Sequence, residues 1–228
     1  MSNTLSHTMF GAVLFPETDP GEEEQSDRLN LQKVLLYHPD EQRPLREQPL
    51  VVFDFETTGL DSGADFIIEI GALRIEKDRI VDEFSSLIKP PTVLAEHITK
   101  ITGITDAMLA NEPTIEEQLP GFLRFIEGAI LVAHNAEFDM AFLRSVCQRE
   151  GYIITWPAFC TLKMARAILP DLESKNLDSL AGHYGFQFES RHRSIGDCKV
   201  TSSVLQSFLR EEHVDINAWR DLKPFAVV

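Results

Sequence analysis

VVFDFETTGL, residues 51–60, has the pattern of a buried strand that runs into a tight turn, because an apolar run is bounded by Pro49 and Gly59. Two acids interrupt that run. Since side chains alternate across a strand, Asp54 and Glu56 are expected to project from one face, separated by Phe55. Like charges at the end of a buried strand are costly unless a cation compensates, and a hard divalent cation with oxygen ligands is the usual remedy. The alternative is a strand that simply ends in solvated acids.

The composition indicates a globular protein of one domain with an appendage. Hydrophobic residues make up 43% and charged residues 25% of the 228 residues. The longest apolar stretches are too short to cross a bilayer, and Met9–Phe15 lacks the length and basic flank of a signal peptide, so a cytoplasmic protein without a membrane partner is expected. Three cysteines without a Cys-x-x-Cys pair favour buried thiols over disulfides or structural zinc.

The formal net charge of −15 argues, taken alone, against nucleic-acid binding, because phosphate contacts need Lys and Arg. An acidic balance is also expected where carboxylates are reserved for metal ions and the surface is kept soluble by Asp and Glu. The charge therefore limits how such a protein could hold a polyanion without excluding that it does.

The sequence divides into three segments. Residues 1–49 form an acidic extension, rich in Pro, Gly and Glu, that is expected to be partly disordered and to carry no chemistry, with one short helix at 29–37. A chain that starts near Arg43 is therefore expected to fold. Residues 50–213 form the main domain, and 214–228 form a C-terminal tail.

Within the main domain the periodicity predicts strands first and helices later. Further strands are expected at 66–75, 80–88 and 129–133. Helices are expected near 94–100 and at 114–127, 137–150, 161–169, 177–184 and 195–212, and Thr114 with Glu117 resembles a capping box. This order predicts an α/β domain with a mixed sheet.

Two later segments carry polar groups in positions that suit a site. Asn135 and Asp139 lie where a strand gives way to a helix, which is where α/β sheets place ligands, although they could equally be a helix cap and a dipole-compensating acid. His192 and Asp197 lead into the last long helix, and each on its own could be an ordinary surface residue.

Taken together, these segments resemble the three motifs of the DEDDh family of 3'-5' exonucleases, which includes the proofreading epsilon subunit of bacterial DNA polymerase III and ribonuclease T. The matching patterns are Asp-x-Glu at 54–56, Asn-x-x-Phe-Asp at 135–139 and His-(four residues)-Asp at 192–197. The segments at 57–59, 101–104 and 176–181 also resemble that family. Ser194 departs from the Ala that is commoner at its position.

The resemblance implies a ribonuclease H-like fold, with a five-stranded mixed sheet flanked by helices. It implies that two Mg²⁺ or Mn²⁺ ions are held by Asp54, Glu56, Asp139 and Asp197. Phosphodiester hydrolysis needs an activated water, a neutralised phosphate and a stabilised leaving oxygen, which two metals can supply. His192 is then the general base, a role that suits a group titrating near neutrality.

The same resemblance implies a substrate site for a single-stranded 3' end. The residues expected there are Thr57, Thr58, Gly59, Leu60, Ile104 and Asn135, although Leu60 and Ile104 could equally belong to the core. A local positive rim is expected from Lys163, Arg166, Arg191 and Arg193. Because the chain is acidic, we expect it to bind only the few nucleotides near the site, and a polymerase partner could add affinity.

Two alternatives remain open at this point. The first is a 3'-5' exoribonuclease that acts on RNA ends or short oligoribonucleotides, since the 2'-hydroxyl is the group that separates the two substrates. The second is an inactive nucleic-acid-binding scaffold, which is disfavoured because its expected mark is the loss of a metal ligand and all five motif residues are present.

Overall fold

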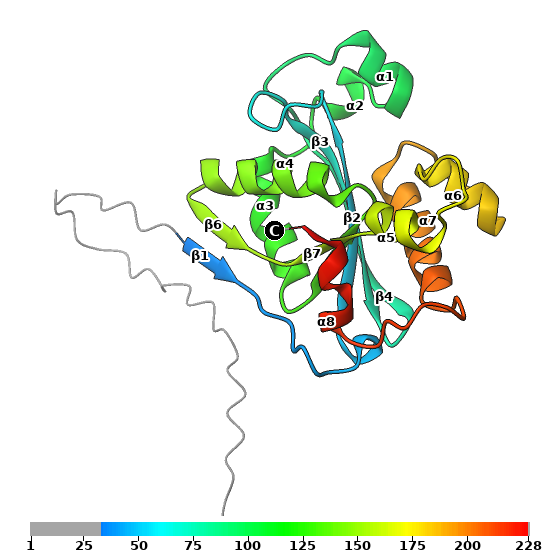
Figure 1. Ribbon diagram of the computed structural model, residues 1–228. Coiled ribbons are helices and arrows are strands. Elements are labelled where there is room, and N and C mark those ends of the chain that lie inside the picture. Colours follow the sequence, from blue (N-terminus) through cyan, green and yellow to red (C-terminus); the bar gives the residue numbers. More distant parts are fainter. Residues whose placement is uncertain (1–32, 228) are drawn as a thin grey trace, which may run out of the picture.

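A mixed six-stranded sheet forms the centre of the protein, in the order β4-β3-β2-β5-β7-β8 (Figure 1). The computed structural model describes residues 33–227. The strands of this sheet are β2 (Leu50–Thr57), β3 (Ile67–Glu76), β4 (Arg79–Leu87), β5 (Ile130–Ala133), β7 (Ala158–Cys160) and β8 (Ala226–Val227). The α/β architecture with a mixed sheet is thus confirmed, but the sheet has one strand more than the expected five.

The central strand β2 links the two halves of the sheet. It pairs antiparallel with β3 and parallel with β5, and its register places Asp54 opposite Gly71 and Glu56 opposite Glu69. A register shift follows between Glu56 and Thr57. A bulge at a strand end redirects side chains and ends the pairing, so β2 leaves the sheet directly after its two acids.

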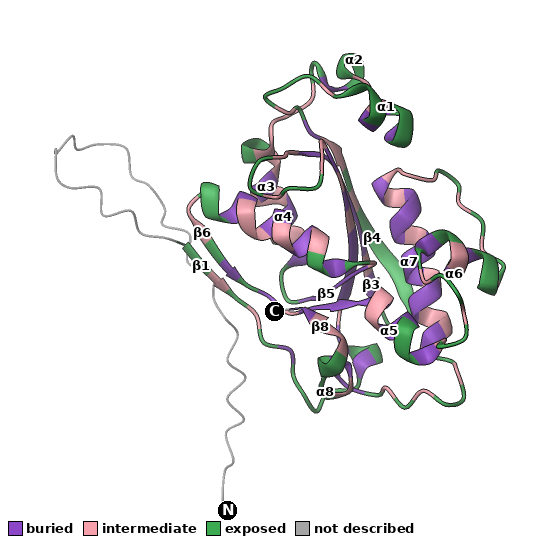
Figure 2. Cartoon of the chain, turned by 45° about the horizontal axis from the view of Figure 1, so that its top comes forward, coloured by how far each residue is buried: buried purple, intermediate pink, exposed green. Residues whose placement is uncertain are grey.

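Helices cover both faces of the sheet. One face packs against α3 (Ile115–Ile126) and α4 (Ala136–Arg149). The other packs against α5 (Thr161–Ile168), α6 (Leu177–Tyr184) and α7 (Ser194–Phe208), of which α7 contacts both β2 and β3 (Figures 1 and 2). The predicted capping interaction at the start of α3 is present, since the backbone N–H of Thr114 donates to Glu117 Oε2 at 2.8 Å.

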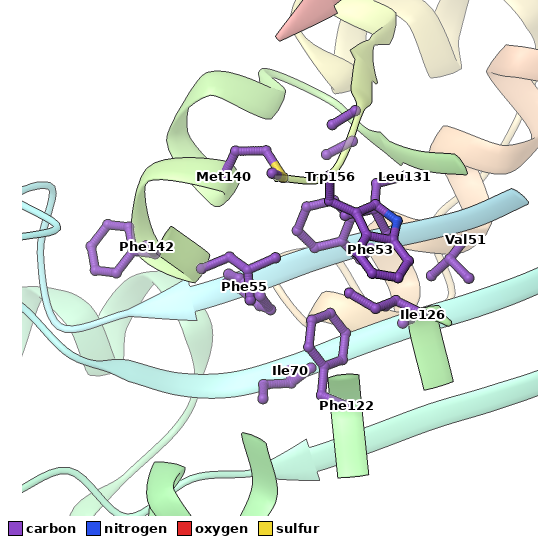
Figure 3. Close-up of a cluster of buried hydrophobic side chains, with 14 of the residues drawn as sticks. Val51, Phe53, Phe55, Ile70, Phe122, Ile126, Leu131, Met140, Phe142 and Trp156 are labelled. Atoms are coloured by element: carbon purple, nitrogen blue, oxygen red, sulfur yellow. The ribbon is translucent and has the colours of Figure 1, made fainter. Parts of the chain in front are cut away.

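The alternation of β2 decides which of its side chains face α7. Val51, Phe53 and Phe55 point into the cluster beneath α3 and α4, where Phe122 meets both phenylalanine rings (Figure 3). Leu50 and Val52 belong to the opposite cluster. Because the period is two residues, Asp54 and Glu56 lie on that second face, as the sequence predicts.

The described part of the N-terminal extension contains a strand, so the helix expected at 29–37 is wrong from residue 33 onward. Strand β1 (Lys33–Leu36) pairs in parallel with β6 (Tyr152–Thr155), forming a separate two-stranded sheet. Tyr37 then stacks on Trp156 with ring centroids 5.1 Å apart. Residues 29–32 lie outside the described part of the chain.

The C-terminal tail also packs on the domain. Pro44 forms an isolated bridge to Ala218, which brings the extension and the tail together. The short helix α8 (Trp219–Leu222) buries both of its terminal residues, and β8 pairs with β7 to become the sixth strand of the sheet. Sequence periodicity misses β8 because two residues are too few to show a pattern.

A small third cluster of buried apolar residues forms beside the start of β3. Helices α1 (Glu96–Thr102) and α2 (Asp106–Leu109) close over Ile68 there, and Ile104 is fully buried between them. The three cysteines are free and buried, as expected. Within residues 33–227, no helix is long and apolar enough to cross a membrane.

Candidate active site

The four candidate metal ligands come from three elements that meet at one end of β2. Asp54 and Glu56 lie on β2, Asp139 lies in the first turn of α4, and Asp197 lies in the first turn of α7. Anionic side chains are favoured in the first turn of a helix by the helix dipole, which helps to hold the two later aspartates there.

A direct hydrogen bond joins the first two motifs. The backbone N–H of Phe55, between the two acids of β2, donates to Asp139 Oδ1 at 3.0 Å. Asp139 is almost fully buried, and burial raises its pKa to about 7 despite that bond. Burial also raises the pKa of Asp54 well above its usual range, and the charges of Asp139, Glu56 and Asp197 raise it further. Asp54 and Asp139 are therefore close enough to repel each other.

The first and third motifs also converge. Glu56, His192 and Asp197 each offer one ligand atom, and these atoms all lie within 4.8 Å of one another. Burial, followed by the charge of Asp197, raises the pKa of Glu56 to about 8, and burial raises that of Asp197 to about 6. His192 is thus next to the carboxylates, as its assignment as a general base requires.

The donor set fits hard divalent cations. The raised pKa values show that the negative charges of these carboxylates are not balanced by nearby cations of the protein. Clusters of carboxylate oxygens of this kind bind Mg²⁺ and Mn²⁺. Among the described residues, Asp197 Oδ1 is buried without a hydrogen-bond partner, which leaves it available to a metal ion. The cluster can therefore hold metal ions without breaking an existing bond at that atom.

His192 has an unusual backbone conformation, with φ of +58°. Few non-glycine residues adopt this left-handed region, and they do so where the surrounding structure enforces it. Burial and the charge of Arg191 lower the pKa of His192 below 6.5. A neutral imidazole near pH 7 can accept a proton, so the environment suits a general base.

Three of the four rim residues are paired with acids, and the partner of Arg193 is Glu69. The guanidinium of Arg191 donates to both carboxylate oxygens of Asp178, at 2.8 and 2.9 Å, and also to Asp197 Oδ2. It lies over the ring of Phe188, 4.9 Å from the centroid. Lys163 pairs with Glu137 at 2.8 Å. These residues balance charge within the protein, which reduces the positive rim that the sequence suggests.

The turn after β2 is built mainly by its own hydrogen bonds. The Thr57 hydroxyl donates to the Gly59 carbonyl at 2.6 Å, and the Thr58 hydroxyl donates to Asp65 Oδ1 at 3.0 Å. A Cβ atom at Gly59 would lie 2.3 Å from Asp65 Oδ2, so a side chain there would force Asp65 to move. Leu60 is 86% exposed at the tip of the turn.

The structure separates the remaining substrate candidates. Asn135 is exposed at the start of α4 with φ of +64°, and its side chain makes no capping hydrogen bond. Ile104 has no exposed surface and packs in the cluster of α1 and α2, which agrees with the core alternative. Leu60 and Asn135 can thus reach a ligand, whereas Ile104 can do so only if that cluster opens.

Sequence reasoning missed two residues beside the site. His134 is mostly buried, its Nδ1 lies 2.9 Å from Thr161 Oγ1, and burial lowers its pKa to about 4. Glu69 on β3 is 3% exposed and receives hydrogen bonds from Arg193. An acid inside the apolar run at 66–75 was the available signal for Glu69.

Comparison with known proteins places the chain in a family. Residues 51–205 match the RNase T family, described as exonuclease. The chain is 38% identical over 168 residues to the DNA polymerase III subunit epsilon of Aquifex aeolicus, covering 73% of this chain and 83% of that protein. It is 41% identical over 165 residues to the DNA polymerase III PolC-type of Caldanaerobacter subterraneus subsp. tengcongensis, covering 72% of this chain but only 12% of that relative.

Solved structures show the same fold. Exonuclease X in complex with 5' overhanging duplex DNA aligns with a TM-score of 0.61 at 26% identity, covering 77% of this chain and 99% of that one. E. coli exonuclease I in complex with a dA16 oligonucleotide aligns with a TM-score of 0.65 at 16% identity, covering 77% of this chain and 42% of that one, and this shows the fold alone. The chain therefore belongs to the RNase T family of DEDD exonucleases.

Proposed function

We propose that this exonuclease removes nucleotides from 3' ends of single-stranded or frayed DNA in a metal-dependent reaction that releases nucleoside 5'-monophosphates. The observation that carries the proposal is the convergence of four carboxylates with raised pKa values beside His192. Asp54, Glu56, Asp139 and Asp197 would hold two Mg²⁺ or Mn²⁺ ions. When bound, these ions supply a nucleophilic water, a neutralised phosphate and a stabilised leaving oxygen.

The protein's own groups have distinct tasks in this reaction. His192 accepts the proton of the attacking water at a ring nitrogen, which its lowered pKa keeps available near neutrality. The Phe55 N–H fixes Asp139 against β2, so the carboxylates of two separate elements keep a constant spacing. Arg191 holds Asp197 by one oxygen and leaves the other free.

The turn at 57–60 is the proposed seat of the terminal nucleotide. The exposed Leu60 offers an apolar surface to the terminal base. Asn135, exposed at the start of α4, is the residue we assign to hydrogen-bond the phosphate.

DNA is favoured as substrate by the kinds of relatives found. The relatives described above are named as DNA polymerase III components, and exonuclease X was solved with duplex DNA. A polymerase or another DNA-processing protein is the proposed partner, because a chain with a net charge of −15 gains little from long-range attraction to DNA.

The test is degradation of end-labelled substrates. Single-stranded DNA, duplex DNA with a frayed end, and RNA are each incubated with Mg²⁺, Mn²⁺ or EDTA. We expect 5'-monophosphates from DNA with metal and none with EDTA. Asp54→Asn should be inactive, whereas Asp82→Asn, an exposed aspartate on β4, should match the wild type. Activity in EDTA, or an active Asp54→Asn, would overturn the metal assignment, and faster cleavage of RNA would identify an exoribonuclease.

A further inference from the structure

A buried carboxylate outside the four candidate ligands lies directly beside them. Glu69 sits on β3 opposite Glu56 in the pairing of the two strands and is 3% exposed. Burying a charge is costly unless it is paired and hydrogen-bonded, so a buried carboxylate such as Glu69 must have partners that compensate its charge.

The compensation is a set of hydrogen bonds from the segment that carries His192. Arg193 Nη2 donates to Glu69 Oε1 at 2.6 Å, and Arg193 Nε lies 3.0 and 3.2 Å from the two carboxylate oxygens. The backbone N–H of Ser194, the first residue of α7, donates to Glu69 Oε2 at 2.9 Å. One carboxylate thus fixes both the residue after His192 and the first turn of α7.

The adjoining part of β3 is shaped to receive the same turn. A Cβ atom at Gly71 would lie 2.6 Å from the Ser194 carbonyl carbon and 2.7 Å from the Ile195 nitrogen, so α7 begins directly against the backbone of β3. The Cys198 thiol reaches the Gly71 carbonyl at 3.4 Å. Glu69 thus makes the polar contacts between β3 and the first turn of α7, and Gly71 lets the two backbones lie close together.

His192 lies between two fixed neighbours. Arg191 is held by Asp178 on α6, and Arg193 is held by Glu69 on β3. The left-handed backbone of His192 is unfavourable by itself and persists only where its surroundings enforce it. Release of either neighbour would let the backbone relax and would move the imidazole.

We infer that Glu69 is a positioning residue that holds His192 at the carboxylate cluster through its bonds to Arg193 and the Ser194 N–H. The inference rests on the proposed role of His192 as the general base. Because Glu69 is buried and its carboxylate is engaged by these bonds, it acts through His192 and not on the substrate. Its effect on the rate should therefore be limited to what His192 contributes.

The decisive experiment is a double-mutant cycle between Glu69→Gln and His192→Ala, measured with saturating Mn²⁺. Glu69→Gln keeps the shape of the side chain and removes its charge. We expect its kcat to fall about 10- to 100-fold with an unchanged KM, which is less than the roughly 10²- to 10⁴-fold loss expected for His192→Ala. In the His192→Ala background, Glu69→Gln should cause no further loss. A further loss there would show that Glu69 acts through another group and would overturn the inference.

Matched variants separate positioning from folding. Glu76→Gln removes a carboxylate from the same strand, where it forms a solvent-exposed pair with Arg74, and should leave kcat unchanged. Arg193→Lys keeps the charge but loses the planar fork and should lie between the wild type and Glu69→Gln. If Glu69→Gln folds poorly, Arg193→Gln tests the same link. A loss of thermal stability with an unchanged kcat per folded molecule would reduce Glu69 to a structural ion pair.

A second readout is independent of nuclease activity. In a crystal structure of Glu69→Gln, His192 should leave its position beside Glu56 and Asp197, whereas the bond from Phe55 N–H to Asp139 should remain. An unmoved His192 would overturn the inference even if the rate fell. If the wild type cleaves no nucleic acid at all, the proposed function fails, and this structure still decides whether Glu69 positions His192.

Discussion

Loss of the proton bound to Glu56 should make the metal-free protein less stable as the pH rises. The folded pKa of Glu56 is raised to about 8 from 4.5, so below the folded value the native state binds a proton that the unfolded chain has already lost. That proton stabilises the native state, and the stabilisation disappears as the pH rises through the folded pKa. The working window lies above about pH 6.5, where His134 is neutral in the folded state and the unfolded chain loses the last of its histidine protons, so that His134 contributes little.

The size of the effect follows from the same two pKa values. Between about pH 6.5 and about pH 8.5, Glu56 alone should remove up to about 2 kcal/mol of unfolding free energy. Partial hydration of the site reduces this to about 1–2 kcal/mol. For a domain of this size the midpoint of thermal unfolding should fall by roughly 2–8 °C.

The assay is thermal unfolding across this pH range in EDTA, for the wild type and for Glu56→Gln. The variant carries an amide that does not titrate, so its midpoint should fall less than that of the wild type. Glu83→Gln, an exposed residue of β4, serves as the control and should follow the wild type. Mn²⁺ should raise the wild-type midpoint most at high pH, because ionised carboxylates bind metal and protonated ones do not. Equal pH slopes for the wild type and Glu56→Gln would refute the reasoning.

Three further predictions concern the base, the extension and the grip on DNA. The rate of cleavage should rise with pH through a midpoint below 6.5, and His192→Ala should lose that limb together with roughly 10²- to 10⁴-fold in kcat; an unchanged pH profile would remove His192 as the base. A chain that starts at Arg43 should fold and cleave short oligonucleotides, but urea unfolding should show a loss of about 1–3 kcal/mol relative to a start at Lys33, because β1 and the stacking of Tyr37 on Trp156 are removed; equal stability would contradict that packing. On a labelled oligonucleotide of about 50 residues, cleavage started with Mg²⁺ and excess unlabelled DNA should stop after one or a few nucleotides, whereas long runs would imply a continuous binding groove.

Much of the central fold can be predicted from the sequence because its signals are local. The alternation of β2 fixes the common face of Asp54 and Glu56, and the strand-to-helix junction at 133–136 places Asp139 in the first turn of α4. These patterns need only neighbouring residues. The strands and helices around the site are accordingly close to their expected bounds.

The parts that could not be predicted depend on distant pairings. Strand β1 forms only because β6 lies beside it, and its four residues show no periodicity of their own. From the sequence alone, Ile104 could contact the terminal bases or belong to the core. Only the structure shows that α1 and α2 close over it. Glu69 and Arg193 are 124 residues apart, so their bond leaves no local pattern in the sequence.

The charge distribution limits how the enzyme can hold a polyanion. Lys163, Arg191 and Arg193 are each paired with an acid of this chain, so a phosphate backbone would have to compete for them. Basic residues that are already paired with acids neutralise few phosphates and release few counter-ions from the DNA, so the salt-dependent part of the DNA affinity should be small. Binding energy must then come from the few nucleotides at the metal cluster or from a second protein. The chain matches only 12% of the length of its PolC-type relative, so most of that relative lies outside the matching segment. A partner that supplies the positive surface would resolve the conflict between a net charge of −15 and a nucleic-acid substrate.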